Sequence, residues 1–251
     1  LLQSRLLDVQ PGERLTEETA FEGVVVRVTH AIAPLAAGGV PRQPGQVVQQ
    51  CAQGLVSIRQ SGQRLAFAAP PSQRREVPAA TLAEVLPALG LAPAQPRRAQ
   101  WLDNGPLWLG LQLDSADTVL ALAPDHARLA ALGCKVGVAG ARGGAGSGAL
   151  IARSNREARA FGAVAARADD ALIEVRAFAA PIGVPEDPVT GSLNASLAQW
   201  LIEAGELPAR YVASQGTALG RAGRVHVERD AQGQVWVGGD CVAVIGGQVR
   251  L

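Results

Sequence analysis

The segment 186–192 constrains the fold of this chain more than any other, because it joins a turn directly to the start of a helix. It reads Glu-Asp-Pro-Val-Thr-Gly-Ser and is followed by apolar residues at a spacing of four, namely Leu193, Leu197 and Leu201. This spacing predicts a helix over residues 193–204 with an apolar stripe along one side. Gly205 is the residue type that commonly ends a helix.

The start of this helix is a candidate binding site for an anion. The first turn of a helix has backbone N–H groups without partners and carries the positive end of the helix dipole. Thr190, Gly191 and Ser192 would present these donors, and Gly191 has no side chain to block an approaching anion. The alternative is an acidic N-cap followed by an ordinary core helix, since acidic residues are common at helix starts.

The two carboxylates of the segment are not expected to share a site. Asp187 precedes Pro188, and the residue before a proline is biased toward extended geometry. Neighbouring side chains of an extended chain point to opposite faces. Only one of Glu186 and Asp187 should therefore face a ligand, and Asp187 is the stronger candidate because it lies nearer the helix start.

The segment 186–192 and its flanks resemble the PhzF-like proteins. These proteins are the phenazine-biosynthesis isomerase family, related in fold to diaminopimelate epimerase. Further matching segments are Cys51-Ala52-Gln53-Gly54-Leu55-Val56, Leu65-Ala66-Phe67-Ala68-Ala69-Pro70-Pro71, Asp103-Asn104-Gly105-Pro106, Pro124-Asp125, Gln215-Gly216 and Gly220-Arg221-Ala222-Gly223-Arg224. The resemblance covers the chain well from about residue 45 onward and poorly before it.

The resemblance implies an α+β fold of two pseudo-symmetric domains. Each domain is expected to be a strongly curved, mostly antiparallel sheet around a central helix. The N-terminal domain is predicted to span 1–97, joined by a returning strand at 242–251, and the C-terminal domain to span 98–241. A proline-rich stretch at 92–100 resembles an interdomain linker. Two hairpins of similar design, after Gln53-Gly54 and after Gln215-Gly216, agree with two related domains.

Residue patterns predict short strands and few helices. Strands are predicted at 24–28, 55–59, 65–68, 107–113, 172–178, 225–227, 235–237 and 241–245. In the segment 107–113 leucine alternates strictly with other residues, which indicates one apolar face. Besides the helix after segment 186–192, helices are predicted at 79–89 and 126–132.

The resemblance also assigns the site. It implies that Glu18 is a proton-transfer residue, that Asp187 assists, and that the substrate is bound by Thr190, Gly191, Ser192, Gln215 and Gly216. The family's early Gly-Asn-Pro and Gly-His-Pro-Thr segments do not occur here. The chain also begins with Leu and contains no Met. These facts suggest that native residues are absent from the sequence, and a degenerate paralogue is the rival explanation.

The function implied is a cofactor-independent isomerase that moves a proton at carbon in a small amino- or hydroxy-carboxylate. The resemblance places the active site in the interdomain cleft and implies a homodimer. The alternative is a non-catalytic protein of the same fold that binds a small carboxylate or acts as a dimeric interaction module. A thiol-based racemase is disfavoured, because Val189 stands where such enzymes would have a cysteine.

Composition argues against several other classes of protein. The net charge of +1 over 251 residues gives no electrostatic case for binding nucleic acid or a membrane surface. No apolar run is long enough for a membrane span, and no signal peptide opens the sequence, so a cytoplasmic protein is expected. The three cysteines and three histidines lack the spacing of metal ligands, so no metal is expected. The glycine-rich run 140–148 lacks the Gly-Lys-Ser/Thr ending of a phosphate-binding loop.

Overall fold

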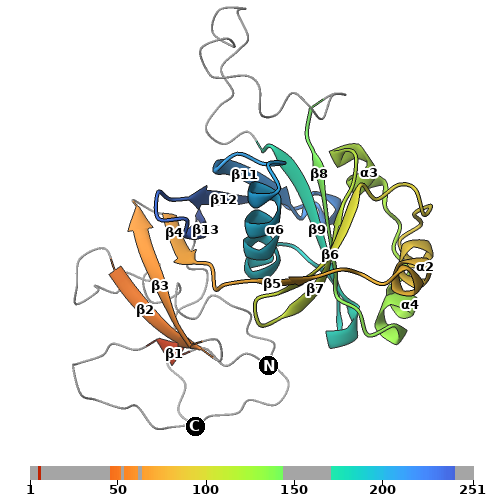
Figure 1. Ribbon diagram of the computed structural model, residues 1–251, viewed down its shortest axis with the longest axis horizontal. Coiled ribbons are helices and arrows are strands. Elements are labelled where there is room, and N and C mark those ends of the chain that lie inside the picture. The colour runs from red at the N-terminus through yellow and green to blue at the C-terminus, as the bar shows by residue number, and fades with distance from the viewer. Residues whose placement is uncertain (1–4, 7–45, 52–53, 62–63, 144–170, 241–251) are drawn as a thin grey trace, which may run out of the picture. The chain divides into compact units, whose positions relative to one another are not determined.

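The computed structural model describes residues 5–6, 46–51, 54–61, 64–143 and 171–240 (Figure 1). By its contacts the chain divides into unit 1 (Leu1–Ala68 with Gly238–Leu251) and unit 2 (Ala69–Val237). The described residues of unit 1 form an antiparallel sheet in the order β1-β2-β3-β4. Its strands are β1 (Arg5–Leu6), β2 (Gln46–Cys51), β3 (Gly54–Ser61) and β4 (Arg64–Ala68).

Unit 2 combines strands and helices. Its helices are α2 (Ala79–Ala88), α3 (Ala116–Ala121), α4 (His126–Ala131) and α6 (Gly191–Glu203), with the 3₁₀ turns η1 (Ala180–Ile182) and η2 (Thr217–Leu219). Its strands are β5 (Gln73–Arg75), β6 (Arg98–Asp103), β7 (Leu107–Gln112), β8 (Val136–Ala141), β9 (Ile173–Ala179), β10 (Val184–Asp187), β11 (Arg210–Gln215) and β12 (Gly223–Arg229). Strand β13 (Val235–Asp240) begins in this unit.

The sheet of unit 2 is mixed but mostly antiparallel. Its strands follow the order β13-β12-β11-β9-β8-β7-β6-β5, and β10 pairs with β9 beside this path. Parallel pairing joins β11 to β9 and β7 to β8. The hairpins predicted after Gln53-Gly54 and Gln215-Gly216 are present as β3–β4 and β12–β13. The pseudo-symmetry of two whole domains remains a prediction, because the described residues of unit 1 are all in strands.

One face of the unit 2 sheet packs against α2, α3 and α4. The predicted leucine alternation is confirmed for Leu109, Leu111 and Leu113, which are at most 1% exposed and lie together in the apolar core, whereas Leu107 is only partly buried. Helical partners in this core include Val85 and Leu89 of α2, Val119 of α3 and Leu129 of α4. This packing holds α2, α3 and α4 against the sheet of unit 2.

The helix α6 lies inside unit 2 and confirms the helix predicted after segment 186–192. The predicted stripe of Leu193, Leu197 and Leu201 is at most 2% exposed. Residues on its other sides are buried as well, which is typical of a helix enclosed by the rest of its domain. Figure 1 shows α6 between β11–β12 and the strands β6–β9. The sheet approaches α6 closely at Gly137, where an added Cβ would meet the side chain of Leu193 of the helix.

We expect Gly137→Ala to destabilise the protein through its contact with α6. The new Cβ would lie 2.2 Å from Cδ1 of Leu193, which is fully buried. Overpacking of this kind costs about 1–3 kcal/mol, and Leu193→Ala alone should cost about 2–5 kcal/mol. The double variant should lose less stability than the two single losses added together, because the shortened side chain at 193 makes room for the new methyl group at 137. Thermal and denaturant unfolding measure this coupling, and strict additivity would contradict the contact.

The boundary between the units lies at residues 68 and 69. The prediction assigned 69–97 to the N-terminal domain, but the structure places these residues in unit 2. The physical reason is that β5 pairs with β6, and α2 contributes Val85 and Leu89 to the core of unit 2. The proline-rich stretch forms a short connection from α2 to β6 instead of an interdomain linker. The predicted returning strand at 242–251 lies outside the described residues, as do the predicted strands at 24–28 and 241–245.

Candidate functional site

The two neighbouring carboxylates at the end of β10 point in different directions, as the sequence predicts. Glu186 forms a two-pronged ion pair with Arg176, at 2.9 Å to Nε and 2.7 Å to Nη2. Both side chains are at most 6% exposed. Arg176 also donates to the backbone carbonyls of Val119 and Leu122. Glu186 is therefore committed to holding β9 and β10 against α3, which leaves Asp187 as the carboxylate of the candidate site.

We expect Arg176→Leu to lower stability sharply, because it leaves the Glu186 carboxylate buried without its charged partner. Breaking a buried pair from one side costs about 3–5 kcal/mol. The double variant Arg176→Leu/Glu186→Leu removes both charges and should recover much of this loss. Denaturant unfolding of the three proteins tests the pair. A double variant no more stable than Arg176→Leu would show that the loss comes from packing and not from the stranded charge.

Asp187 is oriented by Thr190, the N-cap residue of α6. The Thr190 hydroxyl donates to Oδ2 of Asp187 at 2.8 Å and accepts from Nε2 of Gln215 at 3.0 Å. A threonine at the N-cap normally accepts a hydrogen bond from the first turn of its helix. Here the side chain of Thr190 makes no such bond. The helix start therefore keeps backbone donors at Gly191 and Ser192 beside a fixed carboxylate.

Gln215, at the end of β11, connects the pieces of this site. Its Oε1 accepts from the backbone N–H of Thr190 at 3.1 Å and from Nδ2 of Asn194 at 2.8 Å. Its Nε2 donates to the backbone carbonyl of Asp187 at 2.8 Å as well as to the Thr190 hydroxyl. The side chain is fully buried and its amide hydrogens and acceptor sites are all used. Gln215 therefore positions Asp187 and Thr190, whereas the resemblance assigned it to substrate binding.

Gly216 has a backbone role at the same place. Its φ of +89° lies in the left-handed region that favours glycine. A Cβ there would lie 2.8 Å from the backbone oxygen of Pro188 and 3.0 Å from Cβ of Arg221. The absence of a side chain thus lets the end of β11 approach the loop that carries Asp187. The substrate contact that the resemblance implies for Gly216 stays a prediction.

Two residues that sequence reasoning did not assign to the site hold Ser192. Trp108 of β7 donates its indole N–H to the Ser192 hydroxyl at 3.2 Å. Asn104 donates from Nδ2 to the backbone carbonyl of Ser192 at 2.9 Å. Because the hydroxyl oxygen accepts from Trp108, its own hydrogen remains available for an acceptor in the site. The Asp103-Asn104-Gly105-Pro106 match pointed to the right loop, but nothing in the sequence pointed to Trp108.

A positive charge lies over the indole ring of Trp108. The ammonium of Lys135 is 5.1 Å from the centroid of the indole ring, within the range of a cation–π interaction. Partial burial lowers the pKa of Lys135, and the nearby Asp103 carboxylate opposes that shift. The indole ring that donates to Ser192 is thus itself in contact with a cation.

The structure brings together most of the predicted site. Asp187, Thr190, Gly191, Ser192, Gln215 and Gly216 meet where β10 and β11 end and α6 begins. Glu18 lies outside the described residues. Within the described part of the chain, no group of three or more His, Cys, Asp or Glu side chains is placed to hold a metal ion. Among the described helices, none combines the length and hydropathy that crossing a bilayer requires.

Comparison with known proteins identifies the family. The family model described as "Phenazine biosynthesis-like protein" matches residues 26–247. The chain belongs to this phenazine biosynthesis-like family. It is 35% identical over 201 residues to an uncharacterized isomerase of Pseudomonas aeruginosa, which covers 79% of this chain and 62% of that relative. The chain therefore spans less than two thirds of the length of this curated relative.

Solved structures of the phenazine biosynthesis family share the mixed, sheet-rich α+β fold. A PhzF family protein of Bacillus anthracis superposes with a TM-score of 0.64 at 14% identity, covering 89% of this chain and 74% of that one. A putative PhzC/PhzF protein of Clostridium difficile gives a TM-score of 0.57 at 18% identity, with 90% and 74% covered. At these identities the similarity establishes the fold alone.

Proposed function

We propose that this chain is a PhzF-like isomerase that moves a proton at carbon in a small amino- or hydroxy-carboxylate without a cofactor. The observation that carries the proposal is the fixed carboxylate of Asp187 beside the uncapped start of α6. An isomerase of this kind needs an acid or base at the reacting carbon and donors for the negative charge that develops nearby. Both kinds of group are present at this one point of unit 2.

The start of α6 supplies the donors. The substrate carboxylate, or an enolate-like oxygen formed from it, is bound by the backbone N–H groups of Gly191 and Ser192 and by the Ser192 hydroxyl. These donors are already aimed by the hydrogen bonds from Trp108 and Asn104, so little reorganisation is needed during reaction. The positive end of the helix dipole adds to their effect on an anion.

Asp187 supplies the acid or base. Its carboxylate hydrogen-bonds a polar group of the substrate and assists transfer of the proton. Glu18 remains the predicted second group, which takes the proton from carbon and returns it. The homodimer implied by the resemblance is also part of the proposal. The relatives named as isomerases support the reaction type.

The Ser192 hydroxyl should contribute to carboxylate binding, whereas the hydroxyl of Ser196 on the next turn should not. A hydrogen bond to a charged group contributes about 1.5–3 kcal/mol, so Ser192→Ala should weaken binding by about 10–150-fold. Ser196 is fully buried and its hydroxyl has no partner among the described residues, so Ser196→Ala is the matched control. Titration calorimetry with a carboxylate that binds the native protein measures the affinity of both variants. Equal affinities for the two variants would exclude the hydroxyl from the site.

The proposal is tested by screening the full chain against small linear and cyclic amino- and hydroxy-carboxylates. NMR spectra report binding through shifts of the first-turn amides of α6, and they report isomerisation through new substrate resonances. Binding accompanied by isomerisation supports the enzyme. Saturable binding at α6 with no chemistry for any bound member would instead favour the second candidate, a non-catalytic carboxylate-binding protein. That candidate is motivated by the missing Gly-His-Pro-Thr segment.

A further inference from the structure

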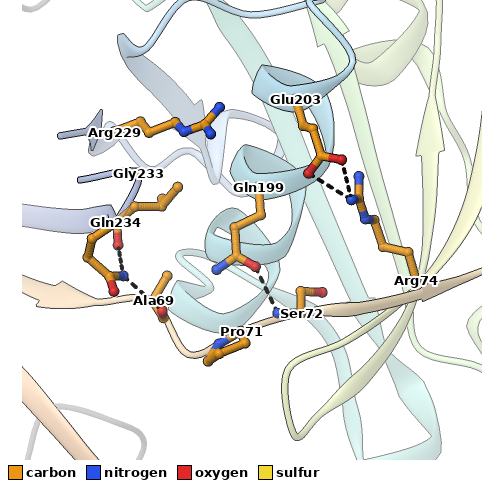
Figure 2. Close-up of a pocket in the computed structure, with 10 residues that line it drawn as sticks. Ala69, Pro71, Ser72, Arg74, Gln199, Glu203, Arg229, Gly233 and Gln234 are labelled. Atoms are coloured by element: carbon orange, nitrogen blue, oxygen red, sulfur yellow. Dashed lines mark hydrogen bonds and ion pairs between the residues drawn. The ribbon is translucent and has the colours of Figure 1, made fainter. Parts of the chain in front are cut away.

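A concave site lies in unit 2, away from the start of α6. It is a pocket of about 280 Å³ between the segment 69–74, the C-terminal half of α6 and the β12–β13 hairpin (Figure 2). Gln199 and Glu203 of α6 line it. Gln199 lies seven residues beyond Ser192, which corresponds to about 10 Å along the helix at 1.5 Å per residue. None of the residues assigned to the candidate active site lines this pocket.

The walls of the pocket are fixed by hydrogen bonds within the protein. The Gln199 side chain accepts from the backbone N–H of Ser72 at 2.8 Å and donates to the backbone carbonyl of Pro70 at 2.8 Å. On the hairpin side, the Ala69 N–H donates to the carbonyl of Val235 at 2.8 Å, and Gln234 donates to the carbonyl of Ala69 at 3.0 Å. The pocket is therefore largely formed before any ligand arrives, which lowers the entropic cost of binding.

The charges of the pocket favour an anion. Arg74 forms a 2.7 Å hydrogen-bonded ion pair with both carboxylate oxygens of Glu203, so these two charges offset each other. Hydrogen bonding and charge from Arg74, together with the charge of Arg229, hold the pKa of the Glu203 carboxyl below its usual range. Glu203 therefore stays ionised near neutral pH. The charges of Arg74, Arg229 and Glu203 sum to +1.

Arg229 is the cation that lies outside the hydrogen-bonded Arg74–Glu203 pair. In the part of the chain that the structure describes, its guanidinium makes no hydrogen bond or ion pair, and Figure 2 shows it reaching from the hairpin toward α6. The apolar surface of the pocket comes mainly from the exposed Pro71, because Ala69 and Val235 are only 4% and 3% exposed. A guanidinium beside apolar side chains suits a carboxylate or phosphate, since its planar fork of donors matches such oxyanions.

We propose that this pocket binds a small oxyanion, a carboxylate or phosphate group held by Arg229, with a short apolar body against Pro71. The site is independent of the proposed reaction. Residues lining it adjoin both points at which the chain passes between the units, 68/69 and 237/238.

The test uses butyrate and inorganic phosphate as probes, titrated into the isotope-labelled full chain. The proposal predicts saturable shifts in the side-chain amides of Gln199 and Gln234 and in the backbone amide of Ala69. Arg229→Gln should weaken that binding at least tenfold, while Arg75→Gln, an exposed arginine of β5 outside the pocket, should leave it unchanged. Saturation by butyrate alone shows that the apolar body is required, whereas saturation by both probes shows that the oxyanion suffices.

Ser192→Ala separates this site from the proposed active site. Shifts at Gln199 and Gln234 should persist in that variant, whereas shifts at the first turn of α6 should weaken. The proposal is overturned if neither probe shifts the pocket amides, or if Arg229→Gln leaves their titration unaltered. If the proposed isomerase activity is not found, the pocket proposal still stands or falls by its own test. The amide shifts report binding at the pocket itself and do not depend on turnover.

Discussion

Asp187→Asn should lower the rate of proton transfer by about 10²–10⁴-fold, because it removes the carboxylate that acts as acid or base in the site. The fold should be kept, since the amide oxygen of Asn can still accept from the Thr190 hydroxyl. Affinity for a carboxylate ligand should be unchanged or higher, because the variant removes a negative charge next to the anion. Turnover and calorimetric binding of the same ligand, measured on both proteins, separate the two effects.

Asp125→Asn is the matched control for this prediction. Asp125 caps α4 by accepting from the backbone N–H of Arg128, a bond that Asn can also make. It lies outside the candidate site and should leave both rate and affinity near those of the native protein. If Asp187→Asn instead weakens carboxylate binding and leaves the rate unchanged, Asp187 is a binding group, and the proton-transfer role is lost.

Gln215→Leu should have the largest effect on stability. The substitution introduces an apolar side chain of similar size and removes hydrogen bonds to Thr190, Asn194 and the backbone of Asp187. Each buried polar group left without a partner costs about 1–3 kcal/mol, so the total loss should reach about 3–6 kcal/mol. Activity of the fraction that remains folded should also fall, because the loop carrying Asp187 loses its anchor.

Gln112→Leu provides the comparison for Gln215→Leu. Gln112 donates a hydrogen bond to Glu206 at a half-buried position, at 3.0 Å. Its loss should cost only about 0.5–1.5 kcal/mol and should not alter activity. Denaturant unfolding gives both free energies, and ligand-induced shifts at α6 report whether the site survives. A Gln215→Leu variant as stable as Gln112→Leu would mean that the network around Asp187 relaxes without it.

Local patterns were sufficient to predict α6 and the opposed directions of its two preceding carboxylates. Each of these predictions depends on residues that are close together in the sequence. They are the apolar spacing of the helix, the glycine after it and the proline after Asp187. The same is true of the leucine alternation in β7. Such features depend on backbone geometry and on burial of one face, both of which are encoded locally.

The supporting contacts of the site could not be predicted in this way. Asn104 and Trp108 meet Ser192 across 88 and 84 residues of sequence, and neither residue belongs to a periodic pattern that points to the site. The role of Gln215 depends on a parallel pairing of β11 with β9, which fixes the side chain on the face toward α6. The unit boundary was missed because Pro93 and Pro96 mark a turn equally well inside a domain and between domains.

The most direct test of the central claim is incorporation of solvent deuterium at carbon. The full chain is incubated in D₂O with carboxylates that bind at α6, and the carbon-bound hydrogen is followed by NMR. The account predicts deuterium incorporation that saturates with ligand concentration and is lost in Asp187→Asn. Saturable binding without any exchange in the native protein, or exchange at the native rate in Asp187→Asn, would contradict it.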